Sequence, residues 1–450
     1  MVSMEFETLP EKAVEKLLEM GAEEAAAIAS LSRSGQVRFS NNQVTVVGFW
    51  DRVTLSVLVR RDRRVVAAST TDLSEEGLER LFRQTVSASR IIKPREHYAP
   101  LPKGPFEYPE VTDTFDPSLE TLRDEAVGMV EEAVSSALDE GAVRAAGTFS
   151  YDSSETRLYT SAGASGSFRS SGAILFVRAF SDGEASGMGV TCGTSLSDLR
   201  PSDAGEEAGR IAGLCRESEP GRAGEYDVVF GRPAVAVLFD ILAGMSSAFY
   251  VDSGLSCLDG KVGSQVASEV LTVHDDGTLP SAMGSRPFDD EGFPTYRKPI
   301  LEQGVLKGYL HNTLTAAKFG VETTGNAGWI VPHPWNVVVE AGDVGDEELM
   351  SEVGDGLYVH NLTYVRFQDY RAGDFSGIVR DGVLHVKDGE PVAAVRGLRL
   401  SENLLELLKK VKAVSKEVRQ VSHWWMEWGS PAVFAPTILA SKVRFTTPTA

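Results

Sequence analysis

Apolar residues recur with a helical period in several parts of the chain. Val14, Leu17 and Leu18 fall on one face of residues 10–20, and Gly21 is a plausible end of that helix. A second amphipathic segment has Ser74 as its N-cap and Gly77 at position N3. Asn312 and Gly320 bracket a third, and Pro233 suits the first turn of a fourth. These patterns predict helices over 10–20, 73–92, 118–141, 202–216, 231–249, 312–320 and 401–414, the last capped by Ser401.

Strand-like runs of β-branched and aromatic residues lie between these helices. The first runs cover 25–33, 36–50, 52–60 and 64–70, and the pair Asn41-Asn42 predicts a turn within the second run. Residues 297–311 predict a hairpin and 436–445 a final strand, whereas "VHDDG" (273–277) is typical of a turn. The order of helices and runs predicts an α+β fold, with N-terminal α/β units built on antiparallel sheets and a C-terminal part rich in mixed or antiparallel strands with few helices.

Two polar segments divide the chain, whose 450 residues are enough for two or three domains. Residues 93–117 hold six prolines, which exclude a helix and predict an extended linker along the surface. A second boundary is expected near 217–227. The predicted organisation is an N-terminal α+β unit (1–92), the linker (93–117), a second α+β unit (118–220) and a β-rich C-terminal domain (225–450).

Composition narrows the classes of function. The net charge of −20, from 64 acidic and 44 basic residues, disfavours binding to nucleic acid. The most apolar run, 233–244, is too short for a membrane span, and the beginning of the chain lacks a signal-peptide pattern, so the expected location is the cytoplasm. Three cysteines without a CxxC pair argue against a disulfide framework and a four-cysteine zinc site. Phosphate-loop and dinucleotide motifs are absent.

The stretch "GSRPFDDEGFPT" (284–295) is the strongest local signal of a site. It places Arg286, Asp289, Asp290 and Glu291 between two prolines. One interpretation is structural, a loop that closes on itself with Arg286 paired to one carboxylate. The other is a groove that binds the backbone or N-terminus of a peptide. Glycine-rich loops at 323–329, which contains Asn326, and at 370–377 have a similar polar character.

Several of these segments together resemble a known family. "GKVGSQVAS", "GSRPFDDEGFPT", "LEQGVLKGYLHNTLTAAKFG", "TTGNAG" and "AGDFSG" follow one another as in the TldD/PmbA family, known also as modulators of DNA gyrase. "VVAASTTDLSEEGLERLF" near the N-terminus is similar as well. The resemblance spans nearly the whole chain. It implies cytoplasmic peptidases of two subunit types that pair with each other. TldD-type subunits carry an HExxxH zinc motif and a zinc-binding cysteine near the C-terminus, and PmbA/TldE-type subunits lack both.

The positions of that zinc motif are degenerate in this chain. The resemblance places the first histidine at Phe239 or Asp240 and the second at Gly244 or Met245. Cysteine does not occur after Cys257, and the expected place reads "SHWWMEWGSP" with a single histidine, His423. Without zinc there is no metal-activated water and no Lewis acid for a peptide carbonyl. The resemblance therefore implies a chain without catalytic or metal-binding residues of its own.

The leading expectation is a non-catalytic PmbA/TldE-type subunit of a zinc peptidase that acts on unfolded peptides. Its expected partners are a zinc-bearing TldD-type homologue, or a second copy of itself, and a peptide. The C-terminal domain is expected to form the dimer, with Trp424, Trp425 and Trp428 as interface candidates. One alternative is a peptidase with atypical ligands among His311, His333 and the acids 289–291. Another is a non-enzymatic interaction protein of the gyrase-modulator type.

Overall fold

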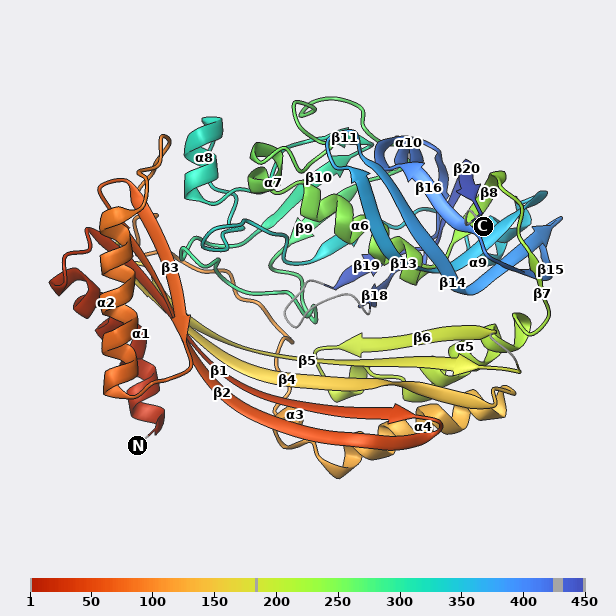
Figure 1. Ribbon diagram of the computed structural model, residues 1–450, viewed down its shortest axis with the longest axis horizontal. Coiled ribbons are helices and arrows are strands. Elements are labelled where there is room, and N and C mark those ends of the chain that lie inside the picture. The colour runs from red at the N-terminus through yellow and green to blue at the C-terminus, as the bar shows by residue number, and fades with distance from the viewer. Residues whose placement is uncertain (1, 183–184, 424–431, 448–450) are drawn as a thin grey trace.

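The computed structural model describes residues 2–182, 185–423 and 432–447 (Figure 1). Trp424, Trp425 and Trp428 lie outside these ranges. Two layers face each other: a long curved sheet from the N-terminal half, and a C-terminal domain on its concave side (Figure 1). None of the helices in the described part has the length and apolar character required to cross a bilayer.

The curved sheet has six antiparallel strands in the order β3-β2-β1-β4-β5-β6. Pairing of β1 with β4, from Ala26 opposite Thr160 to Phe39 opposite Gly147, joins the two N-terminal units into one continuous sheet. The strands are β1 (Glu24–Ser40), β2 (Gln43–Arg61), β3 (Arg64–Thr70), β4 (Arg144–Thr160), β5 (Ser165–Phe180) and β6 (Ser186–Gly193).

Helices cover the convex face of this sheet. Two pack at the end that carries β3, and two others lie together beneath β4 to β6 (Figure 1). Their apolar faces form two cores with the inward side chains of the strands. The helical segments are α1 (Val2–Glu19), α2 (Glu75–Ile91), α3 (Ser118–Thr121), α4 (Asp124–Asp139), the 3-10 turn Leu196–Asp198 and α5 (Pro201–Leu214).

The C-terminal domain contains two further sheets around one large core. The six-stranded sheet consists of β9 (Val273–Asp276), β10 (Arg297–Glu302), β11 (Val305–Leu306), β12 (Val337–Val339), β18 (Arg419–Val421) and β19 (Val433–Ala435). The larger sheet consists of β7 (Ser218–Pro220), β8 (Gly224–Phe230), β13 (Asp355–Asp369), β14 (Asp374–Lys387), β15 (Glu390–Arg396), β16 (Arg399–Asn403), β17 (Val411–Val414) and β20 (Ile438–Thr446).

Helix α6 (Arg232–Met245) packs against strands of both C-terminal sheets. The remaining helices of the described part of this domain are short: α7 (Ala248–Asp252), α8 (Thr313–Phe319), α9 (Asp346–Ser351) and α10 (Leu404–Lys409). The α+β class expected from the sequence is confirmed.

Local capping signals are confirmed at three places. The hydroxyl of Ser74 accepts the Gly77 amide at 3.1 Å at the start of α2. Asn312 caps α8, and Gly320 ends it in the left-handed conformation with φ +68°. Asn41 and Asn42 form the β1–β2 turn with positive φ. These features depend on neighbours within four residues, which explains why the sequence pattern is sufficient to find them.

Two predicted helices have different boundaries. Residues 118–141 form α3 and α4 with a break at Leu122, whose carbonyl accepts the Tyr151 hydroxyl at 2.6 Å. Residues 401–403 belong to β16, and Ser401 pairs with Ser376 across the sheet. Helix α10 starts only after Asn403, whose side chain accepts the amides of residues 405 and 406. In both cases a distant partner overrides the local helical pattern.

Other predicted boundaries are also wrong. Helix α1 starts at Val2 rather than near residue 10, since Phe6 adds to the apolar face that packs on the sheet. "VHDDG" contributes a buried strand, β9, rather than a turn. The early runs form two long strands without a break at Gly35, where a Cβ would lie only 2.1 Å from the Tyr151 ring. Close approach of that ring, and not a turn, accounts for this glycine.

Candidate functional site

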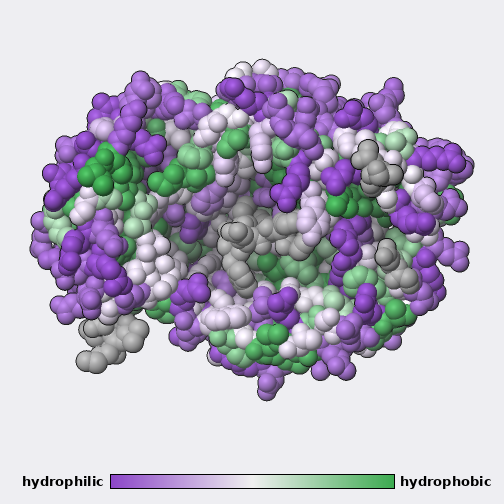
Figure 2. Space-filling view, viewed as in Figure 1, coloured by the Kyte–Doolittle hydropathy of each residue, from purple (hydrophilic) through white to green (hydrophobic). Residues whose placement is uncertain are grey.

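A cavity of about 750 Å³ lies between the concave face of the curved sheet and the C-terminal domain. The space-filling view shows the surface hollowed at this junction (Figure 2). This volume falls within the range of ordinary ligand pockets. Its lining combines many hydroxyls with a few charged groups and apolar side chains from both layers. The cavity is therefore a candidate binding site that neither layer forms alone.

Strands β4 and β5 form the floor of the cavity. Side chains alternate between the two faces of a strand, so every second residue of β4 faces the C-terminal domain. Two pairs of polar side chains connect neighbouring strands on this floor. Gln36 of β1 donates to Ser150 at 3.2 Å, and the hydroxyls of Ser154 and Ser170 are 2.9 Å apart. The residues of β4 in the lining are Ala146, Gly147, Thr148, Ser150, Asp152, Ser154 and Thr156.

Asp152 lies between these two polar pairs. It is half-buried and sits opposite Gly172 of β5, where a Cβ would lie 3.6 Å from its Oδ1 and 3.0 Å from the methyl of Met283. Neither carboxylate oxygen makes a hydrogen bond or ion pair to another described residue within the usual distances. Burial raises the pKa of Asp152 to about 7. The floor thus holds a carboxyl group without a countercharge.

The roof contributes Arg286 from the acidic loop. Its guanidinium lies 4.3 Å from the centre of the Trp335 ring and 5.1 Å from that of Phe168, and its Nη1 pairs with Asp290 at 3.3 Å. His333 lies edge-on to Trp335 beside it. The cation therefore stacks between aromatic rings of the two layers. The expected pairing of Arg286 with one carboxylate of its own loop is present.

One end of the cavity carries two arginines that share one carboxylate. Arg178 of β5 donates from Nε to Asp381 at 2.7 Å, and the Nε of Arg380 lies 3.7 Å from the other oxygen of Asp381. Asp381 is almost fully buried, and both arginine side chains are about one-third exposed. Two positive charges against one negative charge leave this end of the cavity cationic.

The other acids of the loop are buried away from the cavity. Glu291 is fully buried and accepts the amide of Thr313 at 2.9 Å and its hydroxyl at 2.8 Å, at the start of α8. It also pairs with the fully buried Arg60 of β2. Asp289 accepts the amides of Glu291, Phe293 and Ala327. Burial, with the charge of Glu291 nearby, raises the pKa of Asp289 well above its ordinary value.

Asn326 belongs to a second buried network. Its amide donates to Asp275 at 2.6 Å and to the carbonyl of His333 at 2.9 Å. Asp275 is fully buried and also pairs with Lys298 at 3.0 Å. Of the five predicted loop residues, Arg286 lines the cavity. Asp289, Glu291 and Asn326 are fully buried outside the cavity lining, where their hydrogen bonds fix the loops that form the roof. These contacts support the structural interpretation of the loop, whereas the peptide-binding interpretation stays a prediction.

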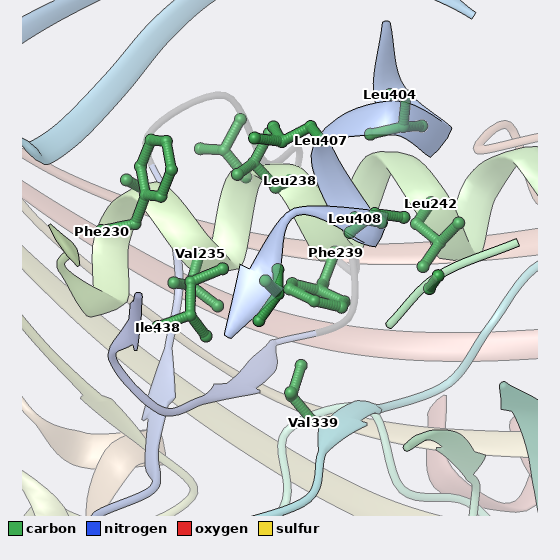
Figure 3. Packing of buried hydrophobic residues seen from close by; sticks show 14 of the residues in the cluster. Phe230, Val235, Leu238, Phe239, Leu242, Val339, Leu404, Leu407, Leu408 and Ile438 are labelled. Atoms are coloured by element: carbon green, nitrogen blue, oxygen red, sulfur yellow. The ribbon is translucent and has the colours of Figure 1, made fainter. Parts of the chain in front are cut away.

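The degenerate zinc-motif positions lie on α6. Phe239 is fully buried and points into the core among Leu408, Val339 and their neighbours (Figure 3). Met245 is also buried, and its sulfur lies 3.6 Å from that of Cys257. Asp240 is partly exposed, and a Cβ at Gly244 would meet no atom within 4 Å. Two of the four positions are therefore part of the hydrophobic core.

Asp240 pairs with His423, whose Nε2 lies 3.2 Å from the Asp240 carboxylate. Both residues belong to the segments where the resemblance places zinc ligands. A zinc site requires three or four closely spaced nitrogen, sulfur or oxygen donors. Within the described ranges, no group of three or more His, Cys, Asp or Glu residues could hold a metal ion. His311, His333 and the acids 289–291 likewise do not converge on one point. The donor set described here does not fit a zinc ion.

The sequence pattern did not indicate a role for Asp152, Arg178 and Arg380, or the buried pair of Arg60 with Glu291. Asp152 is one of several polar residues in the strand "SYDSSETRLY". A strand whose polar residues face solvent would have the same alternation of polar and apolar residues. A covered sheet face and a solvated one look alike in sequence when both are polar. The composition of the linker, with six prolines and four aromatic residues, also did not indicate that the Tyr108 hydroxyl donates to the Gly292 carbonyl of the acidic loop at 2.9 Å.

Family models match three segments of the chain. Residues 25–89 match PmbA/TldA metallopeptidase domain 1, residues 116–216 the central domain, and residues 223–447 the C-terminal domain. Metalloprotease PmbA of Escherichia coli O157:H7 is 26% identical over 430 residues, which cover 92% of each chain. A metalloprotease TldD homolog of Buchnera aphidicola is 29% identical over 233 residues, so the match spans 48% of that relative and 50% of this chain.

Solved structures have the same fold. One from Thermotoga maritima, described as a candidate modulator of a DNA gyrase, has a TM-score of 0.85 at 27% identity and covers 98% of this chain and 100% of its own. TldE from Thermococcus kodakarensis has a TM-score of 0.84 at 22% identity, covering 97% and 99%. The three matched domains, their order and the shared fold lead to one conclusion: the chain belongs to the PmbA/TldD family of metallopeptidases.

Proposed function

We propose that this chain is a non-catalytic, PmbA/TldE-type subunit of a heteromeric zinc metallopeptidase. The observation that carries the proposal is the donor set on α6. Phe239 and Met245 fill the core, Gly244 has no side chain, and Asp240 is paired with His423. A partner of the TldD type would supply the zinc, which polarises the peptide carbonyl and activates water when bound.

The contribution of this chain would be the cavity. Its hydroxyl-rich floor can exchange hydrogen bonds with the amides and carbonyls of an extended peptide. Its rings and aliphatic groups, among them Phe168, Phe176 and Trp335, can contact peptide side chains. In this role the chain holds an unfolded segment while the partner cleaves it.

We further propose that dimers form through the C-terminal domain, with a TldD-type partner where one is present and with a second copy otherwise.

Reconstitution tests this function. The full chain, a TldD-type partner from the same source and their mixture are assayed on an unfolded peptide, with and without a chelator. A matched control is the partner with the first histidine of its HExxxH motif replaced by alanine. We expect chelator-sensitive cleavage by the mixture and none by this chain alone or by the mixture with the altered partner. Cleavage by this chain alone, abolished by a chelator, would show that it is a peptidase with atypical ligands.

A further inference from the structure

The strongest unassigned feature is the isolated carboxyl group on the floor of the cavity. Asp152 is flanked along β4 by Ser150 and Ser154, and both of these hydroxyls already have side-chain partners on the neighbouring strands. Facing Asp152 from β5 is Gly172, and Met283 approaches from the roof. A carboxylate in such surroundings lacks a positive partner, and uncompensated charges are rare in protein interiors. A ligand cation would supply the missing partner.

The opposite charge gathers further along the same face. Arg178 is six residues beyond Gly172 on β5, and the alternation of side chains puts both on the cavity side. At about 3.3 Å per residue, Asp152 and Arg178 are separated by roughly 20 Å along the strands. Arg380 lies at the same end, where it shares Asp381 with Arg178. The cavity therefore has a carboxyl group without a partner midway along β4 and an excess of positive charge at the Arg178 end, whereas Arg286, near Phe168 at the other end, is paired with Asp290.

We propose that Asp152 binds the ammonium group of an extended peptide whose carboxylate reaches Arg178 and Arg380. An extended chain advances about 3.3–3.6 Å per residue, so a span of roughly 20 Å corresponds to about six residues. The floor hydroxyls between the two ends lie along the backbone of such a peptide. This inference rests on the proposed function for its choice of a peptide, and it adds the two ends, the length and the residues that select them.

The ammonium could come from the N-terminus or from a lysine side chain. Both supply the same cation, so the peptides of the test must separate them. A neutral hexapeptide of alternating glycine, alanine and serine with free ends is compared with its N-acetylated form, its C-amidated form and a three-residue version. An N-acetylated hexapeptide with lysine as its first residue provides the side-chain source. Binding to the full chain is measured by calorimetry at pH 7.5, without partner or zinc.

We expect the free hexapeptide to bind at least tenfold more tightly than the acetylated and the three-residue forms, since a charge-assisted hydrogen bond contributes about that factor. The D152N variant should weaken binding of the free hexapeptide about tenfold and leave the acetylated form unchanged. The R380Q variant should weaken binding of the free hexapeptide about tenfold and leave binding of the C-amidated form unchanged. Arg380 is preferred to Arg178 because removing Arg178 would leave the buried Asp381 with less compensation.

A matched control is D51N, which changes an exposed aspartate on β2 of the same sheet, outside the cavity. It should bind all peptides as the unchanged chain does. Equal affinity for free and acetylated hexapeptides, or no effect of D152N, would overturn the proposal. Tight binding of the acetylated lysine peptide that D152N abolishes would assign the ammonium to a side chain instead of the N-terminus.

Lowering the pH gives a second readout. Protonated Asp152 carries no charge, so affinity for the free hexapeptide should fall about tenfold from pH 7.5 to 5.5, while D152N should show a flatter profile. The other charged or titratable groups that line the cavity are Arg178, Arg286, Arg380, Asp381, His333 and Tyr364. Because the D152N variant keeps these groups, any pH dependence of binding that remains in it comes from them and not from Asp152. Because these measurements need no partner, failed reconstitution would count against the proposed function and leave this result standing.

Discussion

Arg60 and Glu291, 231 residues apart in the chain, form an ion pair in which both side chains are fully excluded from solvent. Arg60 comes from β2 of the curved sheet, and Glu291 from the acidic loop over the cavity. Arg60 also donates to Thr313 at 2.9 Å and to the carbonyl of Ala99 in the proline-rich linker at 2.7 Å. One guanidinium thus connects the N-terminal sheet, the linker and the C-terminal domain, and fixes the position of the cavity roof.

Replacing Glu291 with glutamine should destabilise the protein by about 3–5 kcal/mol. The change leaves the Arg60 charge buried without a counter-ion. An uncompensated buried charge lowers the free energy of unfolding more than replacement of both partners by apolar residues would. Denaturant unfolding followed by fluorescence measures the effect. The control is Asp290→Ala in the same loop. Its pair with Arg286 is about one-quarter exposed on both sides, so the cost should stay below about 1 kcal/mol.

That comparison also distinguishes the two interpretations of the loop. If Asp290→Ala leaves the melting temperature unchanged but abolishes peptidase activity of the mixture with a partner, the loop handles the peptide. If Asp290→Ala costs as much stability as the change at Glu291, the loop is primarily structural even at its cavity side. We expect a small loss of stability together with a modest loss of activity, because Arg286 would keep its contacts with two aromatic rings.

Asp152→Asn should stabilise the free protein at alkaline pH. The folded protein holds this carboxyl at a pKa of about 7, above its ordinary value of about 4. Between these values the unfolded chain ionises while the folded protein keeps its proton, so stability falls as the pH rises from about 4 to 7. The asparagine variant avoids that loss. The gain at pH 8 is at most about 4 kcal/mol, and smaller because Asp152 is only half-buried.

Thermal melting at pH 4 and pH 8 checks this expectation. The variant and the unchanged chain should melt at similar temperatures at pH 4 and diverge at pH 8. A variant that is less stable at pH 8 would mean that the carboxylate is compensated within the free protein. A polar site that costs stability is typical of binding sites, so this measurement bears on function as well.

His311 should have the opposite dependence on pH. It is almost fully buried, with Nδ1 3.2 Å from the Thr315 hydroxyl, and burial lowers its pKa to about 4 from an ordinary 6.5. The folded protein binds this proton less tightly than the unfolded chain does. Its stabilising contribution is therefore present above pH 6.5 and is lost as the pH falls towards 4, by up to roughly 3 kcal/mol.

His311→Gln tests that assignment. The glutamine variant loses packing at pH 7.5, but the stability difference between it and the unchanged chain should shrink or reverse at pH 4.5. Chemical unfolding midpoints at the two pH values measure the change. A constant difference at both pH values would show that His311 does not titrate with folding.

Purified and dialysed chain should contain far less than one zinc per molecule. The reason is the identity of the groups at the motif: Phe239 and Met245 lie in the core, and Asp240 and His423 offer two donors where three or four are needed. Elemental analysis after dialysis measures the content, with a zinc-bearing TldD-type homologue as the positive control. About one tightly held zinc per chain would contradict the proposal of a non-catalytic subunit.

Features that depend on near neighbours along the chain could be predicted from the sequence. The caps Ser74, Asn312 and Gly320 and the Asn41-Asn42 turn act within a few residues, and periodicity is sufficient to predict the helices that they bound. The expectation that this chain lacks the zinc ligands depends only on which residues occupy the motif positions, so it could be formed from the sequence and the family resemblance without the fold. The pairing of Arg286 within its own loop follows from proximity along the chain.

The role of the polar residues on the long strands depends on how distant segments of the chain pack together. The alternation in β4 shows that Asp152 shares a face with Ser150, but not whether that face meets water or another domain. Strands β1 and β4 pair although they are far apart in the sequence. Their hydrogen bonds are made by the backbone, which is the same for every residue type, so the sequence of either strand does not identify its partner. The second layer then covers the polar face, so that burial converts an ordinary strand aspartate into an isolated charge and brings Glu291 to Arg60.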